Sequence, residues 1–214
     1  MLKLRKYFRV GVYLLVAIGF SLANAGSYDD FFSAVTRDDG AVVHSLVQRG
    51  FDANSRDPKG QTGLFLALRG GAFAVADALL KEPSLDVNAL NGSDESALMI
   101  AALKGEADWA QRLLDRGAQV NKAGWSPLHY AATGPEPAVV RLLLDRGANI
   151  NAESPNRSTP LMMAAQYGNE ASVELLLARG ADPRLRNDRD LNAADFARLA
   201  KRDALAARLD KLAR

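Results

Sequence analysis

A pattern of about 33 residues recurs along the chain, and it constrains the fold more than any other feature of the sequence. Its clearest copy begins at residues 126–132 with the sequence SPLHYAA. Pro127 suits the first turn of a helix, because its missing N–H would be unpaired there in any case. Gly147 follows a second group of leucines, where the end of a helix needs a residue that tolerates a positive φ. Two helices this short cannot bury their own apolar faces, so each copy needs neighbours on both sides.

The first residues of the copies are separated by steps of 34, 30, 33 and 33 residues, and they fall at positions 62, 96, 126, 159 and 192. This period, with a Thr-Pro-Leu-His-x-Ala start, resembles the ankyrin repeat. The resemblance implies an all-α solenoid of about six repeats, with helix-turn-helix pairs, finger loops and atypical caps at both ends. A tetratricopeptide array is the nearest alternative. It lacks the Gly-Ala-x-x-Asn segment found at 117–121 and 147–151.

We therefore divide the chain into a signal peptide, residues 1–25, and an ankyrin-repeat domain, residues 26–214. The expected repeats cover residues 28–57, 58–90, 91–122, 123–153, 154–187 and 188–214. The last of them is the C-terminal cap, whose helices are expected to share an apolar ridge made of Leu199, Leu205, Leu209 and Leu212.

The first 25 residues have the pattern of an export signal. Four basic residues and no acidic ones precede an apolar run from Val10 to Leu22, and residues 23–25 (ANA) form a small-x-small cleavage site. The run is shorter than the roughly 20 residues that a membrane-spanning helix needs. We predict cleavage and a periplasmic location; the alternative is an uncleaved inner-membrane anchor that faces the periplasm. The chain has no cysteine, so it does not rely on thiols in an oxidising compartment.

Export also changes the charge of the protein. The formal net charge of +2 comes from 27 basic and 25 acidic residues, and the signal contains four of the basic ones. The remainder has 23 basic against 25 acidic residues, a net charge of −2. The basic pI therefore does not indicate nucleic-acid binding, and we expect no nucleic-acid partner.

The sequence contains no pattern typical of a catalytic, cofactor or metal site. Its two histidines are His44 and His129, too few and too far apart for the three or four converging ligands of a zinc site. His129 occupies the histidine position of the repeat signature, where the resemblance implies that the imidazole links neighbouring backbone segments. Met99, Met162 and Met163 occur in inner helices, where they are expected to fill the core rather than bind copper. We predict no catalytic residue, no cofactor and no enzymatic activity.

The resemblance implies that partners bind to a concave face formed by the finger loops and the exposed ends of the first helices. The residues of this chain at such positions are Arg69, Leu90, Leu103, Lys104, Trp125, Gln166 and Tyr167. Trp125 is the most informative of them, because aromatic residues often dominate protein interfaces. It borders a finger three residues shorter than the one from Asn151 to Thr159. The alternative is that Trp125 only covers the shortened finger.

The sequence thus predicts a non-catalytic, monomeric protein-binding module in the periplasm. Its partner would be an enzyme that it stabilises or inhibits, or a toxin that it neutralises. An envelope scaffold anchored by an uncleaved signal is the second reading. A metal carrier or hydrolase is a remote third, for which the sequence offers no site.

Overall fold

The structure is a computed structural model, and it describes residues 26–214. The predicted signal peptide, residues 1–25, lies outside this part. The described residues form α-helices joined by loops, and their only β-type pairing is an isolated bridge between Arg56 and Thr62. The prediction of an all-α repeat fold is confirmed. The chain forms two compact units, one ending at Leu85 and one comprising Asp86–Arg214, and each is described by itself.

The first unit contains a helical segment over residues 26–37 and the helices α2 (Gly40–Gln48), α3 (Gly63–Gly70) and α4 (Phe73–Leu80). Phe31 of the first segment is fully buried, and its ring lies 4.8 Å from that of Phe51. The carboxylate of Asp38 accepts a hydrogen bond of 2.9 Å from the backbone N–H of Val75. It thereby satisfies one of the otherwise unpaired N–H groups at the start of α4.

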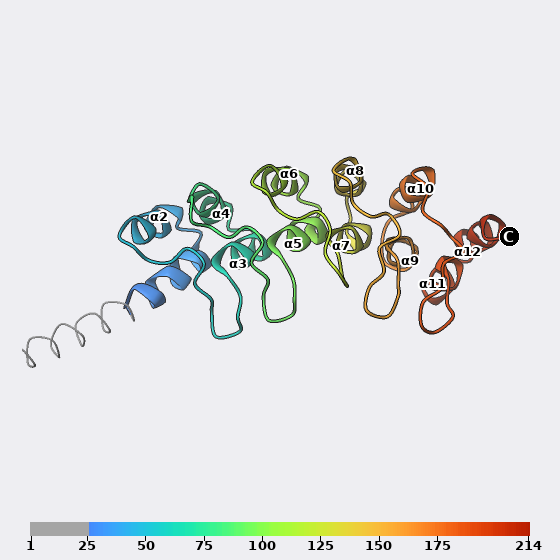
Figure 1. Cartoon of the computed structure of the whole chain (residues 1–214), viewed down its shortest axis with the longest axis horizontal. Helices are drawn as coiled ribbons and strands as arrows, with labels where there is room; N and C mark the ends of the chain where they lie inside the picture. The colour runs from blue at the N-terminus through green and yellow to red at the C-terminus, as the bar shows by residue number, and fades with distance from the viewer. Residues whose placement is uncertain (1–25) are drawn as a thin grey trace, which may run out of the picture. The chain divides into compact units, whose positions relative to one another are not determined.

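The second unit contains four helix pairs, in which each first helix contacts its own second helix. The pairs are α5 (Ala97–Lys104) with α6 (Ala107–Asp115), α7 (Pro127–Thr133) with α8 (Pro137–Asp145), α9 (Pro160–Gln166) with α10 (Glu170–Ala178), and α11 (Ala193–Leu199) with α12 (Asp203–Leu212). Figure 1 shows α5, α7 and α9 in one row and α6, α8 and α10 in a second row above it. The first helices are stacked side by side, because α7 contacts both α5 and α9.

The first helices begin where the sequence predicts. Pro127 is in the first turn of α7, and Gly147 has a φ of 84°, which glycine adopts at little cost. Ser96 caps α5, since its hydroxyl accepts a hydrogen bond of 3.2 Å from the N–H of Met99. Thr159 caps α9 in the same way, through the N–H of Met162 at 3.4 Å. These local signals explain why each copy of the pattern starts a helix at the same place.

Asparagines connect successive copies within the second unit. The side chain of Asn121 donates to the carbonyl of Gly147 at 2.9 Å and accepts from the N–H of Asn149 at 2.8 Å. Asn88 contacts Gly117 and Gln119 in the equivalent way, at 3.0 and 2.8 Å. The asparagine at this position of each copy therefore connects one loop to the next.

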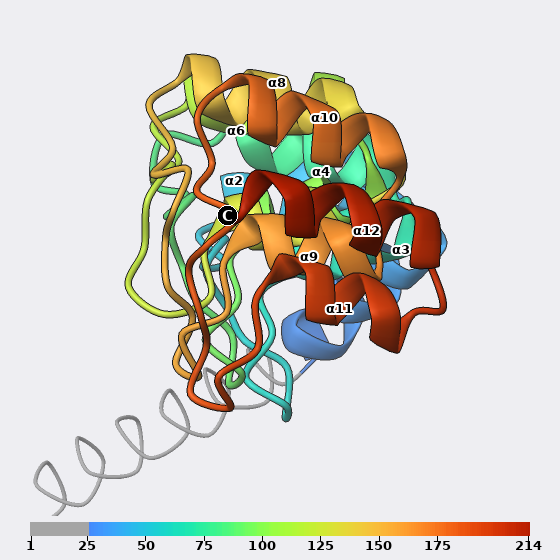
Figure 2. The ribbon, with the colours of Figure 1, turned by 90° about the vertical axis from the view of Figure 1, so that its right-hand side faces the viewer.

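The fingers of the second unit lie on one side of its helices (Figure 2). Three of them are closed by a backbone hydrogen bond of 2.9–3.0 Å between residues four apart, in the pairs Asn91 to Glu95, Ser154 to Ser158 and Asn187 to Leu191. The finger between α6 and α7 has no such pair within the described residues 121–126. It also extends less far than the fingers before α9 and α11 (Figure 1). The sequence-based expectation of a shortened finger here agrees with this geometry.

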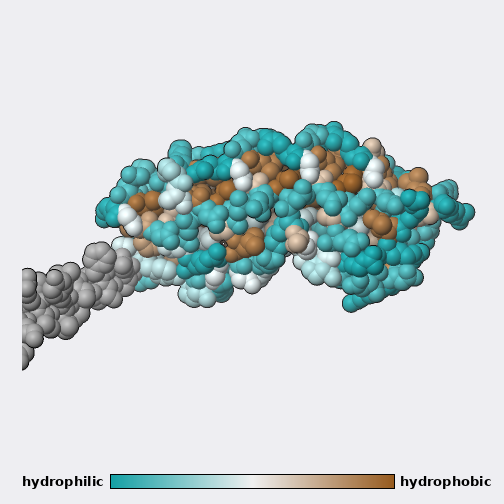
Figure 3. Space-filling view, in the orientation of Figure 1, coloured by the Kyte–Doolittle hydropathy of each residue, from teal (hydrophilic) through white to brown (hydrophobic). Residues whose placement is uncertain are grey.

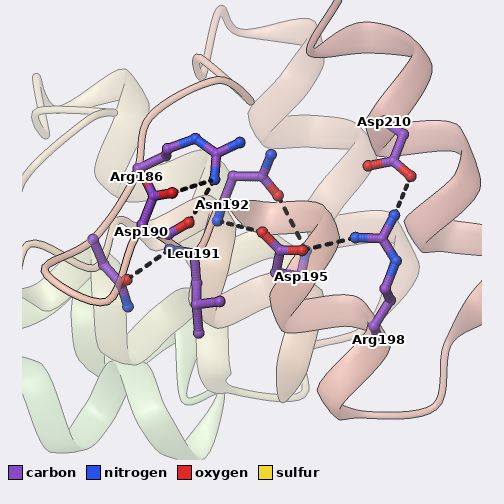
Figure 4. Close-up of polar contacts among 8 residues, drawn as sticks. Arg186, Asp190, Leu191, Asn192, Asp195, Arg198 and Asp210 are labelled. Atoms are coloured by element: carbon purple, nitrogen blue, oxygen red, sulfur yellow. Dashed lines mark hydrogen bonds and ion pairs between the residues drawn. The ribbon is translucent and has the colours of Figure 1, made fainter.

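The C-terminal cap is closed by polar contacts around the start of α11 (Figure 4). Asn192 and Asp195 bond reciprocally, with side chain to backbone distances of 3.1 and 3.0 Å. Arg198 pairs with Asp195 at 2.8 Å and also with Asp210 of α12. These contacts satisfy the N-terminal N–H groups of α11 and hold α12 against it.

The predicted apolar ridge of this cap is only half correct. Leu205 and Leu209 are buried, whereas Leu199 and Leu212 are 62% and 53% exposed. The positions one period earlier, Gln166 and Arg179, are not buried either, so these two leucines lie on the outward sides of α11 and α12.

Figure 3 shows mainly hydrophilic residues on the face turned to the viewer, with hydrophobic residues in the seams along the upper helices. Between residues 26 and 214, no helix combines the length and apolar character that crossing a membrane requires.

Candidate partner-binding surface

Two of the predicted partner-binding residues line a cavity in the second unit. Leu103, at the end of α5, is 36% exposed, and Trp125 borders the shortened finger. Together with four residues of α7 and α9 they enclose a volume of about 220 Å³. The other lining residues are His129, Tyr130, Thr133 and Met163. The cavity thus draws its walls from three successive repeats.

The other predicted residues of the second unit are not among those that line this cavity. Tyr167 follows α9 and is 59% exposed, and Lys104, at the end of α5, is exposed as well. Leu90 and Gln166 are half-buried. The first unit contains Arg69, whose guanidinium lies 5.6 Å from the centre of the Phe65 ring. Within the second unit, the structure therefore brings Leu103 and Trp125 together at one cavity, which Leu90, Lys104, Gln166 and Tyr167 do not line.

His129 forms the floor of the cavity and is almost fully buried. Its Nδ1 accepts from the backbone N–H of Ser126 at 3.2 Å, so its Nε2 carries the proton and donates to the carbonyl of Ser158 at 2.9 Å. Burial lowers the pKa of His129, and the Ser158 carbonyl acts in the opposite direction. The imidazole is therefore neutral, and both of its nitrogens are hydrogen-bonded to backbone groups of two successive fingers. The predicted structural role is confirmed.

Tyr130 connects the cavity to an acidic residue that the sequence analysis did not single out. Its hydroxyl donates to Oε1 of Glu95 at 2.8 Å. Burial raises the pKa of Tyr130, and the hydrogen bond to Glu95 raises it further. The phenol therefore stays protonated and keeps donating to the carboxylate. Glu95 and Tyr130 are 35 residues apart, so only the stacking of two repeats reveals the pair.

Met163 differs from the expectation that all three inner-helix methionines fill the core. Met99 and Met162 are buried, at 0% and 1% exposure, but Met163 is half-buried and lines the cavity. Its position directly follows Met162 on α9, so its side chain leaves the buried stripe by about 100° around the helix axis. A flexible thioether is well suited to an adaptable contact surface.

The remaining geometry offers binding surface rather than reactive groups. The rings of Trp125 and His129 pack edge to face, with centres 5.3 Å apart and planes at 78°. Within residues 26–214, no group of three or more histidine, cysteine, aspartate or glutamate side chains is arranged to hold a metal ion. An apolar cavity next to exposed aromatic and aliphatic side chains is typical of a protein contact surface.

The repeat signature is matched by a family model described as ankyrin repeats in three copies. It matches residues 31–123 and 119–187, which is more than half of the chain. The chain belongs to the ankyrin-repeat family. This confirms the resemblance that the sequence pattern indicated, and ankyrin repeats are modules for protein–protein interaction.

Among the curated relatives of this chain are ankyrin-repeat proteins from animals that are much longer than it is. The chain is 32% identical over 151 residues to the Neurogenic locus Notch protein of Drosophila melanogaster, covering 61% of this chain and 6% of the relative. It is 30% identical over 150 residues to human Inversin, covering 68% of this chain and 14% of the relative. The chain therefore spans only a small part of the length of these proteins.

One solved ankyrin-like structure matches over nearly its whole length. It is a chain in the complex of the predatory endopeptidase Bd0816 from Bdellovibrio bacteriovorus with the immunity protein Bd3460. The match has a TM-score of 0.71 and 29% sequence identity, and it covers 85% of this chain and 97% of the other. This likeness extends beyond the stretch of helices shared with the animal proteins.

Proposed function

We propose that this chain is a non-catalytic module of the periplasm that binds one partner protein through its inner helices and fingers. The observation that carries the proposal is the likeness to a chain from a complex of an endopeptidase with an immunity protein, at 29% identity and 97% coverage of that chain. Membership of the ankyrin-repeat family supports the binding role. The export signal predicted for residues 1–25 supports the location.

The partner in this proposal is an enzyme whose activity the chain blocks or protects against. That solved complex joins an endopeptidase to an immunity protein, so a hydrolase is the first class of partner to test. A repeat array suits such a role, because its long surface can cover the entrance of an active site without supplying a reactive group. The second reading, a scaffold anchored at the inner membrane, requires that the signal remain attached.

The binding surface in this proposal includes Trp125 and Leu103 in the second unit. Trp125 combines a large apolar area with a position on the cavity wall, which are the properties of an interface hot spot. Tyr167 and Lys104 extend the same surface at the ends of α9 and α5. The exposed lysine also offers a charge that steers an acidic partner.

The proposal is tested by affinity capture from periplasmic extract with the purified chain, followed by a titration with the captured protein. Trp125→Ala should weaken binding by about 30-fold, which corresponds to about 2 kcal/mol for a hot-spot residue. The control is Leu212→Ala, which removes an exposed apolar side chain from the last helix, away from the cavity. An activity assay of the captured enzyme, with and without the chain, then shows whether binding inhibits it. If no protein is retained, or if both variants bind like the wild type, the proposal is wrong.

A further inference from the structure

The cavity between α5, α7 and α9 is too small for a cofactor or drug-sized ligand. Its volume of about 220 Å³ lies below the roughly 300–1,000 Å³ of typical small-molecule sites. It is large enough for one side chain of another protein. Anchor side chains that enter such pockets carry much of the binding energy of protein interfaces.

The polar groups that line the cavity already form hydrogen bonds within the protein. Both ring nitrogens of His129 are hydrogen-bonded, and the Tyr130 hydroxyl donates to Glu95. The hydroxyl of Thr133 donates to the carbonyl of His129 at 2.9 Å. The rest of the lining is the apolar surface of Leu103, Met163 and Trp125. A polar side chain entering the cavity would therefore lose its hydrogen bonds to water without gaining new ones. An apolar side chain has no such hydrogen bonds to lose.

Glu95 gives the cavity a negative charge on one side. Its Oε1 accepts from Tyr130 and its Oε2 accepts from the amide of Asn91, both at 2.8 Å. Both donors are neutral, and no cationic side chain of the described chain pairs with Glu95. Its neighbour Asp94, by contrast, is paired with Lys122. A carboxylate that accepts only neutral donors keeps its charge available to a cation from outside.

The charges on α5 also give the site a direction. Glu95 lies two residues before Ala97, the first residue of α5, and Lys104 is the last residue of this helix. The eight residues of α5 extend about 12 Å along its axis, which is longer than the screening length at physiological salt. A basic group on the partner is therefore attracted at the Glu95 side and avoids the Lys104 side.

We propose that the cavity receives one apolar side chain of the partner protein, and that Glu95 binds a lysine or arginine next to that side chain in the partner. This rests on the proposed function, because it assumes that the partner is a protein. It adds the chemistry of the contact: an aliphatic or aromatic residue fills the space between Leu103, Trp125 and Met163, and a cation lies beside Tyr130. The indole N–H of Trp125 is left to donate to the partner backbone.

The test uses a displayed library of random dodecapeptides, selected on the purified chain. Enriched peptides should share an apolar residue adjacent to lysine or arginine. In titrations with synthetic copies of these peptides, the indole N–H signal of Trp125 should shift in the NMR spectrum. The second tryptophan, Trp109, gives the other indole signal, and Trp109→Phe assigns the two. Enrichment of peptides without the apolar–basic pair, or of none at all, would overturn the proposal.

Two matched pairs of variants separate the cavity from the charge. Leu103→Trp fills the cavity and should weaken peptide binding at least tenfold. Leu199→Trp, at an exposed leucine on α11, should leave peptide binding unchanged. Glu95→Gln removes the charge but keeps an acceptor for Tyr130, and it should weaken binding about fivefold. Glu153→Gln, which changes a carboxylate paired with Arg157 in another finger, is the control. Leu103→Lys replaces Leu103→Trp if the larger residue prevents folding.

The outcome also distinguishes this inference from the proposed function. If a captured partner binds the Leu103→Trp and Glu95→Gln proteins as tightly as the wild type, the cavity proposal is wrong and the binding function stands. If peptides with the apolar–basic pair bind the cavity while periplasmic extract contains no partner, the cavity proposal stands and the periplasmic function is wrong.

Discussion

His129→Met isolates a single hydrogen bond, because the chain itself shows how methionine behaves at this position. In two other copies the backbone N–H of the capping residue donates to a methionine sulfur, from Ser96 to Met99 at 3.4 Å and from Thr159 to Met162 at 3.3 Å. Methionine can therefore replace the acceptor role of His129. It cannot donate to the carbonyl of Ser158, which His129 does at 2.9 Å.

The expected cost follows from the burial of both partners. His129 and Ser158 are each 1% exposed, so water cannot readily replace the lost donor. Leaving a buried acceptor unpaired costs about 1–3 kcal/mol, and a swap of similar volume adds less than about 1.5 kcal/mol. We expect His129→Met to lower the free energy of unfolding by about 2 kcal/mol at pH 7.5. With a urea m-value of about 2 kcal/mol/M, the midpoint should fall by about 1 M.

The same variant should change how stability depends on pH. Burial lowers the pKa of His129 in the folded protein, so below pH 6.5 the unfolded chain binds a proton that the folded chain does not. Wild-type stability is therefore fully present above the unfolded pKa and declines as the pH falls. The His129→Met protein does not lose stability in this way. The difference in unfolding free energy between wild type and variant should therefore shrink by up to about 1.4 kcal/mol at pH 5.5. His44 is present in both proteins and cancels in the difference.

Urea titrations of the two purified proteins at pH 7.5 and pH 5.5 provide the four values needed. A variant as stable as the wild type at pH 7.5 would mean that the bond from His129 to Ser158 contributes nothing. A deficit that stays constant or grows in acid would refute the argument that the imidazole is held neutral by burial.

Three further predictions concern other parts of the chain. Arg202→Met should destabilise the second unit by about 2–3 kcal/mol in urea titration, because the Arg202 guanidinium donates to the carbonyls of Ala164, Ala165 and Gly168 at 2.9–3.1 Å. Arg202→Lys should recover part of this loss. Asn121→Ala should lower the free energy of unfolding by about 1–2 kcal/mol, because it removes two exposed hydrogen bonds. A variant as stable as the wild type would mean that water replaces both hydrogen bonds. Intact-mass measurement of the exported protein should give a chain that starts at Gly26, and a mass that includes residues 1–25 would favour the membrane anchor.

The repeat architecture could be predicted because its signals are local. Pro127 and Gly147 act through their own backbone preferences, and the structure places them at the first turn of α7 and at a positive φ. His129 could be assigned a structural role because the repeat signature fixes its position on the helix. The shortened finger was visible as missing residues between 121 and 126, which needed only a comparison of loop lengths.

The cavity could not be predicted in full, since its parts come from different repeats. Glu95 and Tyr130 meet only after α5 and α7 have stacked, and neither belongs to the repeat signature. Met163 was expected in the core because it occurs at an inner-helix position beside Met162, but adjacent helical positions face about 100° apart. Leu199 and Leu212 were expected in an apolar ridge, yet they occupy positions that are not buried in the preceding repeat either, at Gln166 and Arg179.

In a regular repeat array, the surface repeats along with the core. A partner can therefore bind at one defined repeat only if that repeat differs from its neighbours. In the second unit the shared features are structural: the caps at Ser96 and Thr159 recur, as do the bridges made by Asn88 and Asn121. The cavity combines features that occur once among its helix pairs, namely the unclosed finger beside Trp125 and the histidine where the α5 and α9 repeats have methionine. Restoring a full-length finger by inserting three residues between Lys122 and Trp125 should therefore abolish peptide binding at the cavity while preserving the helix stack, as judged by circular dichroism. Peptide binding that survived the insertion would show that the partner does not recognise the shortened finger.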